Sequence, residues 1–104
     1  MARVVLASDV YTPYWLTQLA LAQHVAGRAA DALLSLEQAL QVAERTGSAF
    51  FSAETLRTVG KLRVEAGNPA GIRDVQAAVD LARRQGAPAF EQRARSTLAE
   101  LKAT

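Results

Sequence analysis

The sequence predicts an all-α protein in which two helical hairpins and a final helix pack in series. Half of the 104 residues are hydrophobic, and the helix breakers are few, with three Pro and six Gly that fall mostly at expected turns. A pattern of small and apolar residues also recurs with a period of about 40 residues, which is typical of helical repeat proteins. The recurring pairs include Gly47 and Gly86, Leu36 and Val75, and Gly27 and Gly67.

The first helix is expected over about residues 13–26. Thr12 can accept a hydrogen bond from a first-turn N–H, and Pro13 suits the first helical position, where its missing N–H sacrifices no bond. Gly27 is expected to end the helix. Residues 1–10 have no counterpart in the repeat, so we expect an arm or the remnant of an upstream repeat. The inward side of the first helix is predicted to hold Leu16, Leu19, Ala20 and Gln23.

The second helix is expected over about residues 29–46, with Gly47 as its stop. Its apolar residues follow the i, i+3/i+4, i+7 spacing of a buried stripe, formed by Ala32, Leu33, Leu36, Ala39, Leu40 and Ala43. Alanine in such a stripe lets another helix approach closely. The opposite face is predicted to carry Asp31, Ser35, Gln38, Gln41 and Arg45.

The third helix is expected from residue 48 or 49 to residue 66. Its apolar or small positions are Phe51, Leu56, Val59, Gly60 and Leu62. A glycine inside a helix costs about 1 kcal/mol relative to alanine. We therefore expect Gly60 to make a compensating close contact with the next helix. The run Gly67-Asn68-Pro69 is expected to end the third helix and to begin the fourth.

The fourth helix is expected from residue 69 or 70 to residue 85, and the fifth from about residue 88 to residue 102. The fourth helix has a stripe of Ile72, Val75, Ala78, Val79 and Ala82. In the fifth, Phe90, Ala94, Leu98 and Leu101 are predicted to face inward, and Glu91, Gln92, Arg95 and Lys102 outward. Such a polar outer face suits a cap on the open end of a stack. The predicted organisation is an arm (1–10), two repeats (11–47 and 48–86) and a capping helix (87–104).

The composition argues against several classes of function. Twelve basic and ten acidic residues give a net charge of +2 with interspersed signs, which does not favour a nucleic-acid partner. There is no Cys, which excludes disulfides and thiolate metal sites. No apolar run approaches the roughly 20 residues of a membrane helix, and residues 4–7 are too short for a signal-peptide core. We expect a cytoplasmic protein.

Candidate chemical groups are sparse. His24 is the only histidine and has Arg28 rather than a carboxylate four residues on, so we expect no metal site. The sequence contains no nucleophile elbow and no glycine-rich phosphate loop, so we expect neither an enzyme nor a cofactor. A loose basic cluster would need stacking aromatics to bind nucleic acid. Only Phe90 is near it, and its spacing places Phe90 in the core; the cluster is Arg83, Arg84, Arg93 and Arg95.

These residues resemble the tetratricopeptide repeat family. The first repeat matches at Leu16, Leu19, Ala20, Gly27, Ala32, Leu36 and Ala39. The second matches at Leu56, Val59, Gly60, Gly67, Gly71, Val75 and Ala78. The period exceeds the roughly 34 residues usual for the motif. Gln23 and Arg63 stand where an aromatic is common, and Glu44 stands where proline often is.

A narrower resemblance covers most of residues 14–101. The runs Ala53–Leu62 and Ala82–Ala87 are similar to the C-terminal repeats of large bacterial signalling proteins and transcription regulators. In these an NTPase module, with an adenylate cyclase or a helix-turn-helix domain, accompanies the repeats. The resemblance implies a protein-interaction or regulatory segment, with any catalysis outside the 104 residues of this chain. Its partner would be a protein, a peptide or another domain of the parent protein.

The resemblance also implies that the first helix of each pair lines a concave, partner-binding face. That face would carry Tyr14, Thr17, Leu21, His24, Glu54, Arg57, Lys61, Glu65, Arg93 and Ser96. Arg57, Lys61 and Arg93 could attract an acidic peptide, although the face could equally be an ordinary charged surface. The carboxylate-clamp subclass does not fit, because Thr17, Leu21 and Thr58 stand at its Lys and Asn positions.

Three aromatic residues, Tyr11, Tyr14 and Trp15, lie within five positions of the first helix. They could form an edge that packs on an upstream repeat, or a contact surface for a partner. Without an upstream repeat, this aromatic edge would favour self-association. The alternative function is therefore a structural or homo-oligomerising module with no external ligand.

Overall fold

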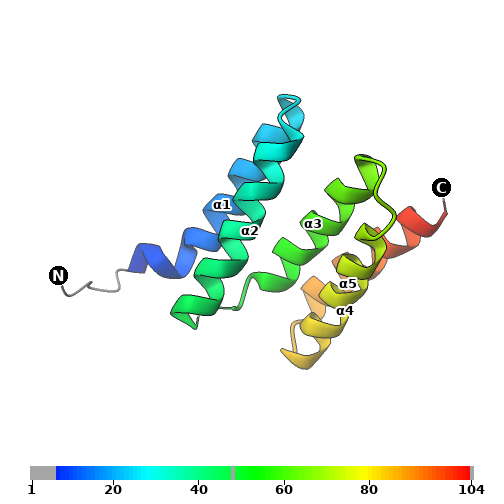
Figure 1. The fold of residues 1–104 in the computed structure, drawn as a ribbon. Coiled ribbons are helices and arrows are strands. Elements are labelled where there is room, and N and C mark those ends of the chain that lie inside the picture. The colour runs from blue at the N-terminus through cyan, green and yellow to red at the C-terminus, as the bar shows by residue number, and fades with distance from the viewer. Residues whose placement is uncertain (1–6, 48, 104) are drawn as a thin grey trace.

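The computed structural model describes residues 7–47 and 49–103, and these contain five α-helices and no strand (Figure 1). The helices are α1 (Ala7–Val25), α2 (Ala29–Thr46), α3 (Ser52–Glu65), α4 (Gly71–Arg84) and α5 (Pro88–Lys102). The all-α class predicted from composition and periodicity is confirmed.

The start of α1 differs from the prediction. The helix begins at Ala7, so Pro13 lies inside it rather than at its first position. Proline lacks the N–H that would bond to the carbonyl of Asp9, and a helix bends where such a bond is lost. The first turn of α1 accordingly points away from the rest of the helix (Figure 1). Of the predicted arm, residues 7–10 belong to α1, and residues 1–6 lie outside the described residues.

Two other helices begin later than predicted. α3 starts at Ser52, and its predicted start at Ser48 lies outside the described residues. A turn closed by a bond from the N–H of Ser52 to the carbonyl of Ala49, 3.1 Å long, precedes α3. α4 starts at Gly71, because the Asn68 side chain accepts a bond from the N–H of Ala70 at 3.0 Å and holds the chain in a turn.

Glycine ends the hairpin helices as predicted. Gly27 and Gly67 follow α1 and α3 with φ of 80° and 90°, a conformation that favours glycine. The next residue then donates back into the last turn. Arg28 bonds to the carbonyl of Gln23 and Asn68 to that of Arg63, each at 2.8 Å. The two tight connections are therefore the same structure, used once in each hairpin.

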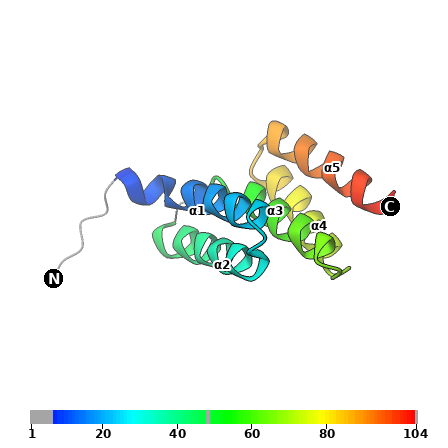
Figure 2. The same cartoon turned by 90° about the horizontal axis from the view of Figure 1, so that it is seen from above.

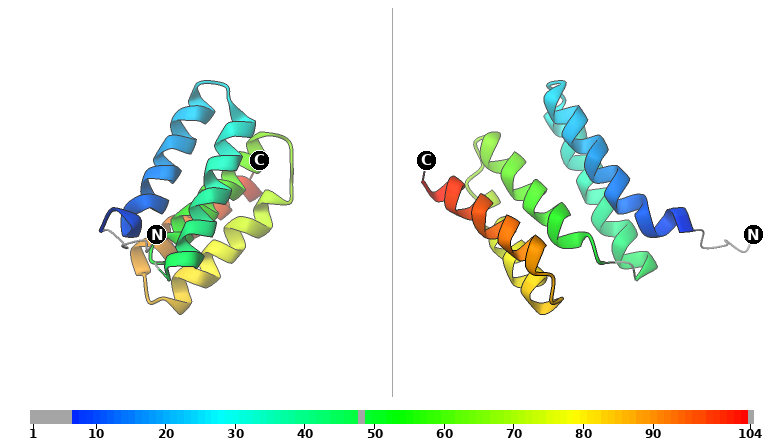
Figure 3. Two further views of the ribbon diagram at one scale, coloured as in Figure 1. Left: turned by 60° about the vertical axis from the view of Figure 1, so that its left-hand side comes forward. Right: turned by 180° about the vertical axis from the view of Figure 1, so that it is seen from behind.

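The helices form two hairpins, α1 with α2 and α3 with α4, followed by α5 (Figure 3). α3 is the central helix and packs against each of the other four. Within the described residues α2 and α4 do not touch. Seen from above, α2 and α4 lie on one side of the molecule and α1 and α5 on the other, with α3 between them (Figure 2). The described chain is elongated, 50 × 33 × 17 Å.

The core lies where consecutive hairpins meet. One cluster joins the two hairpins and contains Ala20, Ala32, Leu36, Val59 and Leu62. A second joins the second hairpin to α5 and contains Ala78, Val79 and Ala94, with Leu56 and Leu98 packed on it. The predicted stripes of α2 and α4 are buried at Ala32, Leu36, Ala39, Ala43, Val75, Ala78, Val79 and Ala82.

The closest helix crossing is built from two glycines. A Cβ on Gly60 would collide with the carbonyl oxygen of Gly71, and a Cβ on Gly71 would collide with the carbonyl oxygen of Gly60. The added Cβ of Gly60 would also lie 2.9 Å from the backbone nitrogen of Val75. The prediction that Gly60 marks a close contact with the next helix is confirmed.

Leu19 and Ser35 are oriented opposite to the prediction. Leu19 was expected to face inward, but 47% of it is exposed, because it lies on the side of α1 opposite the other helices. Ser35 was expected to face outward, but it is buried and its hydroxyl donates to the Gln23 side chain of α1 at 2.7 Å. A polar residue can occupy this buried place because it has a partner there. No helix in the described part of the chain is long and apolar enough to cross a membrane.

Candidate functional site

All six aromatic residues of the chain line one apolar groove of about 380 Å³. Three come from α1, two from the connection before α3 and one from the first turn of α5; they are Tyr11, Tyr14, Trp15, Phe50, Phe51 and Phe90. We call this feature the aromatic groove. The groove joins the three aromatics that lie close together in the sequence of α1 with three aromatics that the sequence analysis did not relate to them, namely Phe50, Phe51 and Phe90.

Edge-to-face contacts link the rings. Phe51 is at the centre, 5.2 Å from Tyr14 and 5.8 Å from Phe90 between ring centroids. Tyr14 also meets Trp15 at 5.0 Å, and Phe50 meets Tyr11 at 6.2 Å. Edge-to-face pairs at such distances are favourable beyond the area that they bury. The rings therefore support one another in a fixed arrangement.

Much of the aromatic surface is open to solvent. Trp15 is 63% exposed, Tyr11 54% and Phe50 46%. The prediction that Phe90 belongs to the core is wrong, because Phe90 is half-buried and packs on Phe51 at the groove. The repeat places it there: Tyr11, Phe51 and Phe90 follow one another at the repeat period and so occupy equivalent positions. That recurrence is the sequence signal that could have revealed the groove.

A buried carboxylate lies one turn beyond the groove. Glu54 was predicted on the concave face, but it is only 4% exposed. Its Oε2 accepts a bond from Arg57 at 2.9 Å and lies 3.2 Å from Nη1 of Arg93. Arg57 also donates to the Thr97 hydroxyl of α5 at 3.3 Å. The two arginines neutralise the carboxylate, as a buried charge requires, and join α3 to α5.

Thr17 is the second predicted face residue that is buried. Its hydroxyl lies 2.9 Å from the Thr55 hydroxyl of α3 and donates to the carbonyl of Pro13 at 2.7 Å. It is 2% exposed, so it joins the two hairpins instead of facing a partner. The two threonines belong to different helices and are not equivalent in the repeat, so no periodicity in the sequence indicates this pair.

The remaining predicted residues are at least partly accessible. Tyr14, Leu21 and Arg93 are exposed, whereas His24 and Lys61 are half-buried. Nε2 of His24 lies 2.7 Å from Oε2 of Glu65, which connects the ends of α1 and α3. Lys61 has no ion pair among the described residues. The accessible face thus changes from aromatic at the groove to basic at Arg93 and Lys61.

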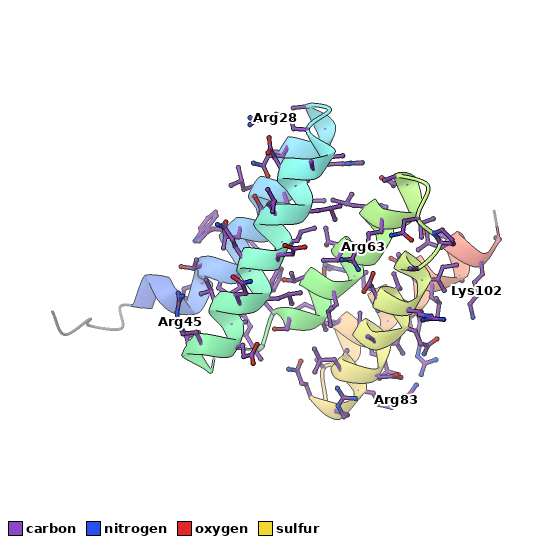
Figure 4. All side chains as sticks on the ribbon, viewed as in Figure 1. Arg28, Arg45, Arg63, Arg83 and Lys102 are labelled. Carbon is purple, nitrogen blue, oxygen red and sulfur yellow. The ribbon has the colours of Figure 1, made fainter. Side chains whose placement is uncertain are left out.

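The other charges are dispersed. Figure 4 shows Arg28, Arg45, Arg63, Arg83 and Lys102 spread over the molecule, with Arg63 between α3 and α4. Glu91 of α5 lies 2.9 Å from Nε of Arg95 and 3.5 Å from Nε of Arg83, and the bond from Arg95 holds the pKa of Glu91 below its ordinary value. No group of three or more His, Cys, Asp or Glu residues within the described ranges could hold a metal ion.

Comparisons with protein-family models, with curated proteins and with solved structures found no match to this chain.

Proposed function

We propose that the chain is a tetratricopeptide-like binding module that holds an extended segment of a protein partner across α1, α3 and α5. Its place would be a regulatory segment of a larger cytoplasmic signalling or transcription-regulating protein, with no catalysis of its own. The observation that carries the proposal is the gathering of all six aromatic side chains in one groove, with Arg93 one helical turn after Phe90 on α5.

The arrangement of the helices supports this class. Two hairpins follow each other along the chain, and the first helix of each pair packs against the first helix of the next. In helical repeat proteins such packing creates an extended surface that contacts partners along its length. The aromatic groove runs from α1 over the connection before α3 to the first turn of α5, which is the expected position for a ligand that lies across the repeats.

The chemistry of the face suggests what the segment would present. Exposed aromatic rings in an apolar groove suit a large apolar side chain, and burial of such area contributes about 25 cal/mol per Å². Arg93 follows Phe90 by three positions, so it lies one turn along the same face of α5. It is 59% exposed at its side chain and can donate to a carboxylate. The proposed ligand is an extended peptide that combines an apolar anchor with an acidic residue.

A display library of random dodecapeptides, panned on the full chain, tests the proposal. We expect enrichment of peptides with a large apolar residue near Asp or Glu. Synthetic copies should bind the Phe90→Ala variant at least about tenfold more weakly, since truncation of an aromatic anchor commonly costs more than about 1.4 kcal/mol. The Arg93→Gln variant should bind several-fold more weakly and lose most of the salt dependence.

Gln41→Ala is the matched control, because Gln41 is exposed on the outer side of α2 and away from the groove. Arg57 is a poorer choice than Arg93 for this test, because its side chain is 17% exposed against 59% and it also bonds to Thr97 of α5, so its loss would disturb the packing of α3 on α5. The proposal fails if no peptide is enriched, or if enriched peptides bind Phe90→Ala and Arg93→Gln variants as tightly as the wild type. Thermal melts of each variant show that the fold is retained.

A further inference from the structure

The outer side of α1 carries an exposed apolar stripe. Tyr11, Trp15, Leu19 and Ala22 recur at intervals of four, four and three positions, so they lie on one side of the helix. All four are exposed, with Trp15 at 63% and Leu19 at 47%. The opposite side, with Pro13, Thr17 and Ala20, is the buried one. Apolar residues clustered in this way on a surface helix indicate an interface.

The repeat relates the stripe of α1 to one side of α3 and to one side of α5. One repeat later the same positions are Phe51, Thr55, Val59 and Leu62 of α3, and one repeat after those they are Phe90, Ala94, Leu98 and Leu101 of α5. In α3, Val59 and Leu62 pack against Ala20, Ala32 and Leu36 of the preceding hairpin. In α5, Ala94 and Leu98 pack against Ala78 and Val79 of the preceding hairpin. The stripe of α1 is therefore the same packing face, left uncovered by the described residues.

We infer that this stripe pairs with the stripe of a second copy of the chain in a two-fold symmetric dimer. This inference goes beyond the proposed function: the stripe shares Tyr11 and Trp15 with the aromatic groove and adds Leu19 and Ala22, which lie outside it. In a two-fold interface each surface meets its own copy, so like charges would repel. The sequence has no Asp, Glu, Lys or Arg between Asp9 and Arg28, and self-pairing therefore opposes no like charges.

Head-to-tail stacking of copies fits less well. The face of α5 that a following unit would cover corresponds to the α3 residues that pack on α5, and it carries the exposed Arg93, Arg95 and Ser96. Docking this polar face on the α1 stripe would bury the two arginines against apolar side chains that offer them no acceptor. The apolar stripe of α1 therefore suits its own copy better than it suits this face of α5.

The expected dimer is weak. α1 has 19 residues, so it is about 28 Å long, and one helix face buries less than the roughly 800 Å² per partner of a standard stable interface. We expect dissociation on dilution, with a monomer below about 1 µM and a substantial dimer fraction near about 1 mM.

Analytical ultracentrifugation of the full chain over that concentration range tests the inference. The wild-type mass should rise from 11.1 kDa towards twice that value. A variant with Leu19→Glu and Ala22→Glu should stay monomeric throughout, since four carboxylates would meet in the interface. Both positions are exposed, so the variant should keep the wild-type melting curve. The matched control adds the same charges by Gln38→Glu and Gln41→Glu on the exposed side of α2 and should dimerise as the wild type does.

A wild-type chain that remains monomeric at the highest concentration would overturn the inference and leave the stripe to a different occupant, such as a helical hairpin of another protein. Dimerisation of the Leu19→Glu, Ala22→Glu variant with wild-type affinity would overturn it as well, because the contact would then lie elsewhere. Peptide binding at the groove is measured separately at low concentration, so the failure of either proposal does not decide the other.

Discussion

The two hairpins use equivalent positions for the same contacts but fill them with different residues. In the second hairpin Gly60 meets Gly71, and the equivalent residues one repeat earlier are Ala20 and Ala32, both fully buried. One turn along, Arg63 donates to Asp74 at 2.9 Å in the second hairpin. The equivalent pair in the first is Gln23 and Ser35, joined by a neutral hydrogen bond of 2.7 Å.

This difference shows which properties the repeat requires. At the crossing, the requirement is small size, and the second hairpin tolerates less bulk than the first. At the bridge between the two helices, the requirement is a donor and an acceptor that satisfy each other, whether charged or neutral. Position within the helix pair, more than residue identity, defines the repeating unit. The following variants test how far the two hairpins are equivalent.

The largest effect is expected where the helices cross. Gly60→Ala gains about 1 kcal/mol of helix propensity, but overpacking against the Gly71 carbonyl costs about 3 kcal/mol. The net loss of about 2 kcal/mol should lower Tm by about 10 °C. In the first hairpin the opposite change, Ala20→Gly, should destabilise by about 1 kcal/mol, because a methyl group is already accommodated there.

Thermal and urea unfolding of both variants would check this pair of expectations. A Gly60→Ala variant at least as stable as the wild type would show that α3 and α4 do not cross as closely as described.

An intermediate effect is expected between the hairpins, at the buried pair of Thr17 and Thr55 hydroxyls. Thr17→Val or Thr55→Val alone should cost about 1 kcal/mol, since each leaves the other hydroxyl without its cross-helix partner. The double variant should cost less than the sum of the two, because neither hydroxyl then remains. Strict additivity in a double-mutant cycle of unfolding free energies would mean that the two hydroxyls do not interact.

The smallest effect is expected at the polar bridges. Asp74→Ala should cost about 0.5–1 kcal/mol at low salt and less at about 1 M salt, where screening acts within about 3 Å. Ser35→Ala should cost about 0.5 kcal/mol at either salt concentration, because its bond to Gln23 is neutral and only partly buried. Urea titrations at the two salt concentrations measure both. If salt changed the unfolding free energies of the two variants equally, the charged and the neutral bridge would not differ in the way that we expect.

Sequence periodicity predicted the features that are determined by the residues of a single helix. The stripes of α2 and α4, and the glycine stops at Gly27 and Gly67, follow from spacing and backbone conformation alone. Pro13 was misplaced because a proline at a helix start and a proline at a helix bend look alike in sequence. The resemblance to a helical repeat family helped to place the first helices on one face, but it did not show which residues on that face are open.

Features that depend on how the hairpins stack were not predictable from single helices. The burial of Thr17 and Glu54 requires partners in other helices, and Phe90 reaches the aromatic groove only because the stack aligns it with Phe51. Ser35 was assigned outward because a serine looks polar in a helical pattern, whereas its Gln23 partner lies on another helix. These contacts depend on the register between helices, which the spacing within one helix does not specify.

α1 and α3 are successive copies of one helix, and the outer side of α1 is open where that of α3 is covered. Because the chain has no native Cys, single Leu19→Cys and Val59→Cys variants can be compared directly by thiol labelling in dilute solution. We predict that the thiol at position 19 reacts nearly as fast as a free thiol, and that the thiol at position 59 reacts at least about a hundredfold more slowly, since labelling there requires local opening. Equal rates at the two positions, or faster reaction at position 59, would show that the outer side of α1 is not more open than that of α3.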